Sequence, residues 1–384
     1  MSEATANKRM ALKGYATDEG TARYRERMIG DGKAIAEHFR RARSLWLSSV
    51  GIGTYLGKWD EETDRRYEDA VARAVSLGAN VIDTAANYRF QRSERSIGSA
   101  LQRLINDKTT ARDELVVCTK GGYLPFDSEP PRGQDAMRAY VEETFVKTGI
   151  VELSNIVAGS HCMTPRYLAH QIDQSLANLG LASIDVYYVH NPETQLGVVS
   201  RAEFELRMRA AFEQLERIVS EGRIKSYGVA TWNGFRVAPD AKSFHALERL
   251  TELAREVGGD DHHFRFVQVP FNLAMPEALT LDNQPLGGER VSLFEAASAL
   301  GVAVVASASI MQGKVARDLS EDVRAPLGPL ASDAQTAIQF TRSAPNVTTA
   351  LVGMSRTAHV EENLQLARIR PVRTEDFRRL FSQS

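Results

Sequence analysis

The 384-residue sequence contains only two cysteines, Cys118 and Cys162. Neither belongs to a CxxC motif or to a Cys/His spacing that is typical of metal sites. Secreted domains held by disulfides, and zinc-binding domains, use cysteines in larger number or in closer pairs. We therefore expect no disulfide framework and assign no metal ligand, and a reducing cytoplasm is the expected location.

The sequence also lacks long hydrophobic runs and an excess of either charge. No apolar stretch reaches the roughly 18 residues of a membrane span, and the opening MSEATANKRM has no signal-peptide core. The formal net charge of -2 provides no basic field for nucleic acid or for a membrane surface. With 43% hydrophobic and 25% charged residues, the composition is that of an ordinary globular protein, which we expect to be neither exported nor membrane-embedded.

Residues 1–43 differ in character from the rest of the chain. The stretch YRERMIGDGKAIAEHFRRARS is dense in charge, and its few apolar residues recur at helical spacing. This pattern predicts an N-terminal extension of one or two helices on the surface, followed by a main domain at residues 44–384.

From Leu45 onward, short β-branched runs alternate with amphipathic helical segments. Two predicted helices have clear ends: residues 61–77 stop before Gly78, and a helix opening at Thr164-Pro165 stops at Gly180. The predicted strands are SSVGIGTY from 48, ANVIDTA from 79, ELVVCTK from 114, SIDVYYVH from 183, IKSYGVAT from 224, FRFVQVPF from 264, GVAVVASAS from 301 and VTTALVG from 347. Eight such units predict a (β/α)8 TIM barrel, with a doubly wound sheet as the competing fold.

Chemistry in such barrels takes place at the C-terminal ends of the strands. Asp83 ends the second predicted strand with Tyr88 on the loop after it, Lys120 ends the third, and His190 ends the fourth. A buried carboxylate needs a cationic partner, and Lys120 is placed to supply it to Asp83. We expect the lysine to lower the pKa of the Tyr88 phenol from about 10 toward neutrality.

The motifs NVIDTAANY, VVCTKGG, YYVHNP, VQVPFN, ASIMQGK and ALVGMSRTAHVEENL, in this order, resemble the aldo-keto reductase superfamily. The resemblance covers about residues 45–370. It implies a (β/α)8 barrel that binds a nicotinamide dinucleotide without a Rossmann fold. It also implies that Asp83, Tyr88, Lys120 and His190 are the catalytic tetrad, although each alone has an ordinary structural explanation. Gly51-Ile52-Gly53 lacks the spacing of a Rossmann phosphate loop and is better read as a barrel strand.

The segment GMSRTAHVEEN at residues 353–363 predicts a phosphate-binding turn. A strand ends on Gly353 and a helix begins near Ser355, so backbone amides and the Ser355 hydroxyl can cradle a phosphate. Arg356 adds forked donors that suit an adenosine 2′-phosphate, which favours NADPH over NADH. The predicted cofactor is therefore NADP(H).

Further cofactor contacts follow from the resemblance. It implies the adenine end at His359, Glu362 and Asn363, the nicotinamide at Thr231 and Gln268, and the pyrophosphate loop at Ser309, Ile310 and Gly313. Ser307 stands where the family often has an aromatic residue that stacks on the nicotinamide, and Thr231 where it usually has a Ser-Asn pair.

The segment between Lys120 and His190 is longer than in compact members of the family. The excess, residues 121–163, follows a strand on the active-site side, so it is either a lid or a decorative insertion. The remaining histidines considered, His161, His262 and His263, are interpreted as surface or loop residues.

These observations predict an NADPH-dependent oxidoreductase acting on a small-molecule carbonyl or the matching alcohol, with Tyr88 as general acid/base. Two alternatives stay open: a non-catalytic nicotinamide-binding regulatory subunit, and a barrel lyase or isomerase without net redox. The substrate and the oligomeric state do not follow from the sequence.

Overall fold

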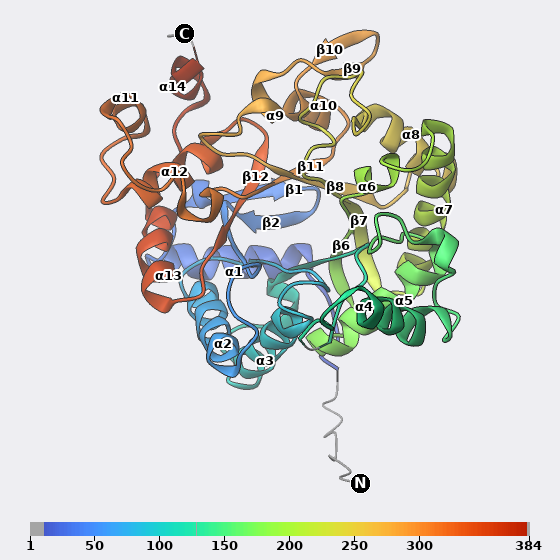
Figure 1. Ribbon diagram of the computed structural model, residues 1–384. Coiled ribbons are helices and arrows are strands. Elements are labelled where there is room, and N and C mark those ends of the chain that lie inside the picture. The colour runs from blue at the N-terminus through green and yellow to red at the C-terminus, as the bar shows by residue number, and fades with distance from the viewer. Residues whose placement is uncertain (1–10, 128, 382–384) are drawn as a thin grey trace.

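The computed structural model describes residues 11–127 and 129–381. Parallel strands form one closed barrel in which the last strand pairs with the first (Figure 1). In barrel order they are β3 (Val50–Gly53), β4 (Val81–Asp83), β5 (Val116–Gly121), β6 (Ile184–His190), β7 (Ile224–Ala230), β8 (Phe264–Pro270), β11 (Ala303–Ser307) and β12 (Val347–Gly353). The predicted (β/α)8 barrel is confirmed, and the doubly wound alternative is wrong.

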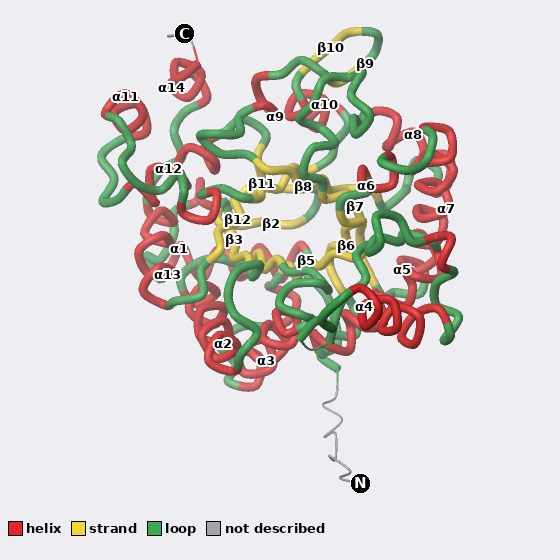
Figure 2. The backbone as a smooth tube through the Cα atoms, in the orientation of Figure 1, coloured by secondary structure: helices red, strands yellow, loops and turns green. Residues whose placement is uncertain are grey.

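Helices surround the strands on the outside of the barrel (Figure 2). They include α2 (Glu61–Ser76), α3 (Arg92–Asn106), α5 (Pro165–Leu179), α7 (Arg201–Ser220), α8 (Leu247–Gly258), α10 (Leu293–Ala299), α12 (Asp333–Ser343) and α13 (Thr357–Asn363). Further helices are α4 (Gln134–Val141), α6 (Glu193–Leu196), α9 (Glu277–Thr280), α11 (Glu321–Arg324) and α14 (Thr374–Arg378), and a small hairpin pairs β9 (Gln284–Leu286) with β10 (Glu289–Val291). None of the described helices combines the length and apolarity that a membrane span requires.

Helix ends follow the local sequence. The Asp60 side chain caps α2 by accepting a hydrogen bond from the Thr63 amide at 2.8 Å, and Gly78 follows the helix with a φ of 110°. Gly180 ends α5 in the left-handed conformation that glycine adopts without strain. Both predicted helix ends are confirmed.

Each barrel strand is apolar on both faces. Side chains such as Val81, Val116 and Val186 pack together in one cluster, whereas Ile82 and Val117 belong to the larger core that includes the surrounding helices. Parallel strands buried on both faces read as nearly continuous apolar runs, which explains why they could be recognised in the sequence.

The N-terminal region is more deeply integrated than predicted. It contains one α-helix, α1 (Asp18–Gly30), and a hairpin of β1 (Phe39–Ala42) and β2 (Leu45–Ser48) that immediately precedes β3. Tyr24 of α1 is fully buried, and Ala42 and Leu47 join the same cluster as Val81. Within residues 11–43, α1 agrees with a predicted helix, whereas the strand β1 was not predicted and its hairpin packs against the N-terminal end of the barrel. The hairpin also crosses the predicted boundary between residues 43 and 44. That this boundary separates two domains stays a prediction.

The segment at residues 121–163 has internal structure. It carries α4, a π-helical turn at Glu142–Val146 and a 3-10 turn at Leu153–Asn155. Leu124, Phe145, Val151 and Cys162 form a separate small hydrophobic cluster with Tyr167 of α5. Whether this segment acts as a lid stays a prediction.

Candidate active site

The structure brings Asp83 and Lys120 together at the C-terminal end of the barrel. Lys120 Nζ lies 2.5 Å from Asp83 Oδ1, and the two side chains are 1% and 5% exposed. Lys120 Nζ also donates to the Thr84 carbonyl oxygen at 2.8 Å, and the Gln268 amide nitrogen donates to Asp83 Oδ2 at 2.8 Å. Both carboxylate oxygens therefore have donors, as a charge buried at this depth requires.

Tyr88 lies beside this pair on the loop after β4. Lys120 Nζ is 4.9 Å from the centre of the Tyr88 ring. The ring meets His190 edge to face with centroids 6.0 Å apart, and Tyr55 with centroids 5.0 Å apart. Asp83, Tyr88, Lys120 and His190, which come from three successive strands and one loop, thus surround a common point.

The prediction that Lys120 lowers the pKa of Tyr88 toward neutrality is wrong. Burial raises the pKa of Tyr88 above 10, and the nearby Lys120 opposes this shift only in part. Burial also opposes the charge on Lys120, but Asp83 and Tyr88 outweigh it and raise the lysine pKa above 10.5. At neutral pH the site therefore holds a protonated phenol next to a charged ammonium group.

His190 is the last residue of β6 and is buried. Burial, with Lys120 and His161 adding to it, holds its pKa well below 6.5, so the imidazole is neutral at pH 7. His190 Nδ1 has no hydrogen-bond partner among the described residues. A neutral imidazole can still donate one hydrogen bond, which is what a substrate oxygen would need.

Two residues at this site were not predicted from the sequence. His161 is fully buried, its Nε2 donates to the His190 carbonyl oxygen at 2.8 Å, and its Nδ1 accepts from Gln195 at 2.8 Å. Tyr123 lies with its ring 5.2 Å from the His190 ring, and its hydroxyl accepts from Asn191 at 3.1 Å. The sequence offered no signal for His161, because it reaches the site through the fold of residues 121–163.

The three other histidines lie in loops between the named helices and strands, as interpreted, but His161 and His262 are buried there and do not reach the surface. His263 is partly exposed and contacts Glu216 through Nδ1 at 2.7 Å. His262 and His263 precede β8 at the opposite end of the barrel from Asp83.

The predicted phosphate-binding turn lies between β12 and α13. The helix begins at Thr357 with Arg356 as the capping position, so the predicted start near Ser355 is two residues early. Gly353 and Arg356 are exposed and Ser355 is partly buried. The exposed guanidinium and the free amides at this turn remain available to a phosphate group.

The predicted adenine-end residues belong to α13 and differ in their surroundings. His359 is exposed, and Glu362 accepts a hydrogen bond from the Ser332 hydroxyl at 2.5 Å. Asn363 is buried, and its Oδ1 has no partner in the described part of the chain. An unpaired buried amide oxygen can accept a bond from a ligand.

Residues predicted near the nicotinamide and the pyrophosphate lie within β8 or follow β7 and β11. Thr231 is buried with a hydroxyl that has no partner in the described ranges, whereas the amide nitrogen of Gln268 is used by Asp83, which the sequence did not predict. Ser309 is buried and bonded weakly to the Ala306 carbonyl oxygen at 3.4 Å. Ile310 is partly buried, and Gly313 has a φ of 85°. Ser307 ends β11 and offers no aromatic ring.

Comparison with known proteins gives one consistent family. Residues 49–326 match the model of the aldo/keto reductase family. The chain is 29% identical over 160 residues to D-threo-aldose 1-dehydrogenase from a Pseudomonas species, covering 41% of each chain. It is 29% identical over 191 residues to an NADH-specific methylglyoxal reductase from Escherichia coli, covering 48% of this chain and 49% of the relative. The chain thus matches about half the length of these curated relatives, or less.

Solved structures share the fold at low identity. An aldo/keto reductase from Klebsiella pneumoniae in complex with NADP and acetate has a TM-score of 0.59 at 17% identity, covering 91% of this chain and 95% of that one. An aldo-keto reductase from Bacillus halodurans in its holo form has a TM-score of 0.60 at 19% identity, covering 90% and 96%.

Proposed function

Because the chain belongs to the aldo/keto reductase family, we propose that it is an oxidoreductase that uses NADP(H) on a small-molecule carbonyl or the matching alcohol. The observation that carries the proposal is the buried Lys120–Asp83 ion pair beside the Tyr88 ring. Family membership supports the reaction class, and the Klebsiella structure in complex with NADP supports the choice of cofactor.

Each residue of the tetrad has a distinct part in this reaction. Tyr88 donates its phenolic proton to the carbonyl oxygen as negative charge develops there. Lys120, held in place by Asp83 and Thr84, stabilises the phenolate that this transfer leaves behind. Neutral His190 orients the carbonyl by a hydrogen bond. Gln268 donates to Oδ2 of Asp83 and so holds the carboxylate with its other oxygen, Oδ1, on Lys120.

The residues present fit a nicotinamide dinucleotide. Thr231 Oγ1 and Asn363 Oδ1 are buried polar atoms without partners among the described residues. Thr231 directly follows β7, and Asn363 is the last residue of α13. Thr231 would meet the nicotinamide end, Ser355 and Arg356 the adenosine 2′-phosphate, and Asn363 the adenine end. When bound, the cofactor supplies the hydride for the carbonyl carbon.

The test compares the turnover of Tyr88→Phe with that of the parent. Both are measured by NADPH oxidation in a screen of aldehydes, ketones and sugars. The substitution keeps the ring and removes the transferable proton, so turnover should fall about 10²-fold or more while NADPH binding and the melting temperature stay unchanged. Tyr55→Phe is the matched control, because this neighbouring phenol is 58% exposed and lies outside the tetrad.

Three results would contradict the proposal. If Tyr88→Phe turns over substrate at the rate of the parent, the phenol is not the proton donor. NADPH binding without turnover of any carbonyl, together with a co-purifying partner, would indicate a regulatory subunit. Turnover without a change in nicotinamide absorbance would indicate a lyase or isomerase.

A further inference from the structure

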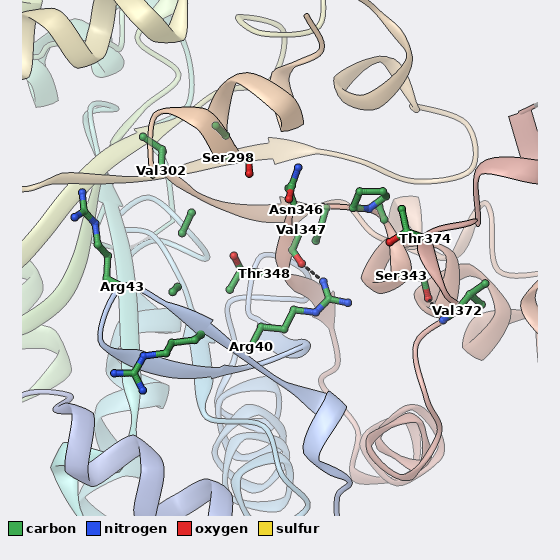
Figure 3. Close-up of a pocket in the computed structure, with 17 residues that line it drawn as sticks. Arg40, Arg43, Ser298, Val302, Ser343, Asn346, Val347, Thr348, Val372 and Thr374 are labelled. Carbon is green, nitrogen blue, oxygen red and sulfur yellow. Dashed lines mark hydrogen bonds between the residues drawn. The ribbon is translucent and has the colours of Figure 1, made fainter. Parts of the chain in front are cut away.

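A cavity lies at the N-terminal end of the barrel, away from the tetrad. Its volume is about 410 Å³, within the roughly 300–1,000 Å³ of small-molecule sites. It is bounded by the β1–β2 hairpin, the segments that lead into β11 and β12, and the chain near Val372 (Figure 3). Val347, at its wall, begins β12, whereas Gly353 at the cofactor turn ends the same strand. Six residues of strand separate the two sites by about 20 Å.

The lining of this cavity carries positive charge without a carboxylate. Arg40, Arg41 and Arg43 line it together with hydroxyl and amide side chains, and none of the described lining residues is Asp or Glu. Arg41 forms an ion pair with Asp18 at 2.7 Å. The side chain of Arg43, at the hairpin turn, has no hydrogen bond or ion pair within the described ranges.

Arg40 is a largely buried cation with backbone partners only. Its guanidinium donates to the carbonyl oxygens of Val347 (Figure 3) and of Arg342, and among the described residues it has no acidic partner. Arg342, next to it, is also buried and donates to Gln339, Ser49 and Ile369, and no carboxylate of the described ranges pairs with it. Burial, with Arg40 adding to it, lowers the pKa of Arg342 to about 9.

Other buried arginines of the chain are neutralised. Arg112 pairs with Asp185 at 2.8 Å, and Arg89 pairs with Asp64 at 2.5 Å. Buried charges are normally paired in this way, because an uncompensated charge costs several kcal/mol, roughly. Arg40, which lines the N-terminal cavity, and Arg342 beside it depart from that rule, because neither pairs with a carboxylate in the described part of the chain. An external anion would supply the missing charge.

We propose that this cavity binds a small phosphoryl-bearing anion. Guanidinium groups match the oxygens of a phosphoryl group in forked pairs, and a dianion neutralises two of them. Arg40 and Arg43 provide the charged donors, and Ser298 and Thr348, whose side chains also line the cavity, provide hydroxyl donors. The site is independent of the proposed redox function, since none of its residues belongs to the tetrad or to the cofactor turn.

Calorimetric titration of the full chain with inorganic pyrophosphate tests the proposal at low ionic strength. Arg43→Gln should weaken binding at least tenfold, as expected for a lost charged hydrogen bond. Its melting temperature should not change, because the Arg43 side chain is exposed and makes no bond in the described ranges. Arg132→Gln, at a side chain that is 90% exposed, is the control that should leave the affinity unchanged. Arg356→Gln reports any pyrophosphate that binds at the cofactor turn instead.

Further probes separate the sources of the phosphoryl group. Glycerol phosphate binding that depends on Arg43 would indicate a phosphate ester, whereas binding of pyrophosphate alone would indicate a free inorganic anion; either supports the site. Citrate binding as tight as pyrophosphate would overturn the phosphoryl assignment. The site itself is overturned if no phosphoryl probe binds, if Arg43→Gln binds like the parent, or if only Arg356→Gln loses affinity.

Discussion

Asp83→Asn tests the charge balance of the candidate active site. The burial of the Asp83–Lys120 ion pair determines how much the substitution lowers the free energy of unfolding. The substitution keeps the size of the side chain and removes the counter-charge of Lys120, whose side chain is 1% exposed. Breaking a buried ion pair by removing one partner costs about 3–5 kcal/mol. We expect the free energy of unfolding at pH 7 to fall by that amount, because Lys120 stays buried with an uncompensated charge.

The pH dependence of this loss has a definite sign. In the parent, Asp83 and Tyr88 keep the pKa of Lys120 above 10.5 despite its burial. Without the Asp83 charge, burial should depress the pKa of Lys120 below its unfolded value of about 10.4. The unfolded variant then binds more protons than the folded variant, so its free energy of unfolding rises with pH above the depressed pKa. The deficit relative to the parent should be largest at neutral pH and narrow toward about pH 10.

Urea unfolding of parent and variant at about pH 7 and 9.5 measures both effects. Asp173→Asn is the matched control, because its ion pair with Arg223 lies at the surface with Asp173 63% exposed. The control should lose no more than about 1 kcal/mol, because exposed ion pairs contribute little. A loss in Asp83→Asn as small as in the control, or a deficit that stays constant with pH, would refute the reasoning.

Two further predictions concern turnover and cofactor choice. The rate of carbonyl reduction should be nearly constant from about pH 6.5 to 9, because burial raises the pKa of Tyr88 and lowers that of His190 out of this range. The rate of alcohol oxidation should rise with pH. An inflection of the reduction rate near pH 6.5 would argue against a neutral His190. Arg356→Ala should reduce the ratio of NADPH to NADH affinity by a factor equivalent to about 1–3 kcal/mol. Fluorescence titration measures this ratio, Arg132→Ala is the control, and an unchanged ratio would rule out a 2′-phosphate contact.

The barrel could be predicted because its strands are apolar on both faces and its helices end at recognisable signals such as Gly180. The convergence of Asp83, Lys120 and His190 followed from the same topology, since the C-terminal ends of neighbouring parallel strands meet. The β1–β2 hairpin was missed because arginines interrupt the apolar residues of its first strand and turn, and its strands are recognised only once they pack against the barrel.

Electrostatic properties of the site could not be predicted in the same way. The sequence correctly placed Lys120 near Tyr88, but the direction of the phenol pKa depends on how deeply the ring is buried, which only the packing of the loops determines. His161 shows the same limit: its contact with the His190 carbonyl oxygen joins segments 29 residues apart through an insertion whose path has no sequence signature.

The backbone after Tyr88 links this packing to the proposed chemistry. Arg89, Phe90 and Gln91 have φ values of 50°, 56° and 67°, a left-handed run that is costly for side chains of this size. Such strain persists only when neighbouring contacts outweigh it, and Arg89 supplies them by donating to the Lys58 carbonyl oxygen at 2.8 Å and pairing with Asp64. The run therefore ties the loop after β4 to the loop after β3 immediately beside Tyr88. A phenol that must present its proton to a substrate oxygen within about 3 Å needs a backbone held in this way.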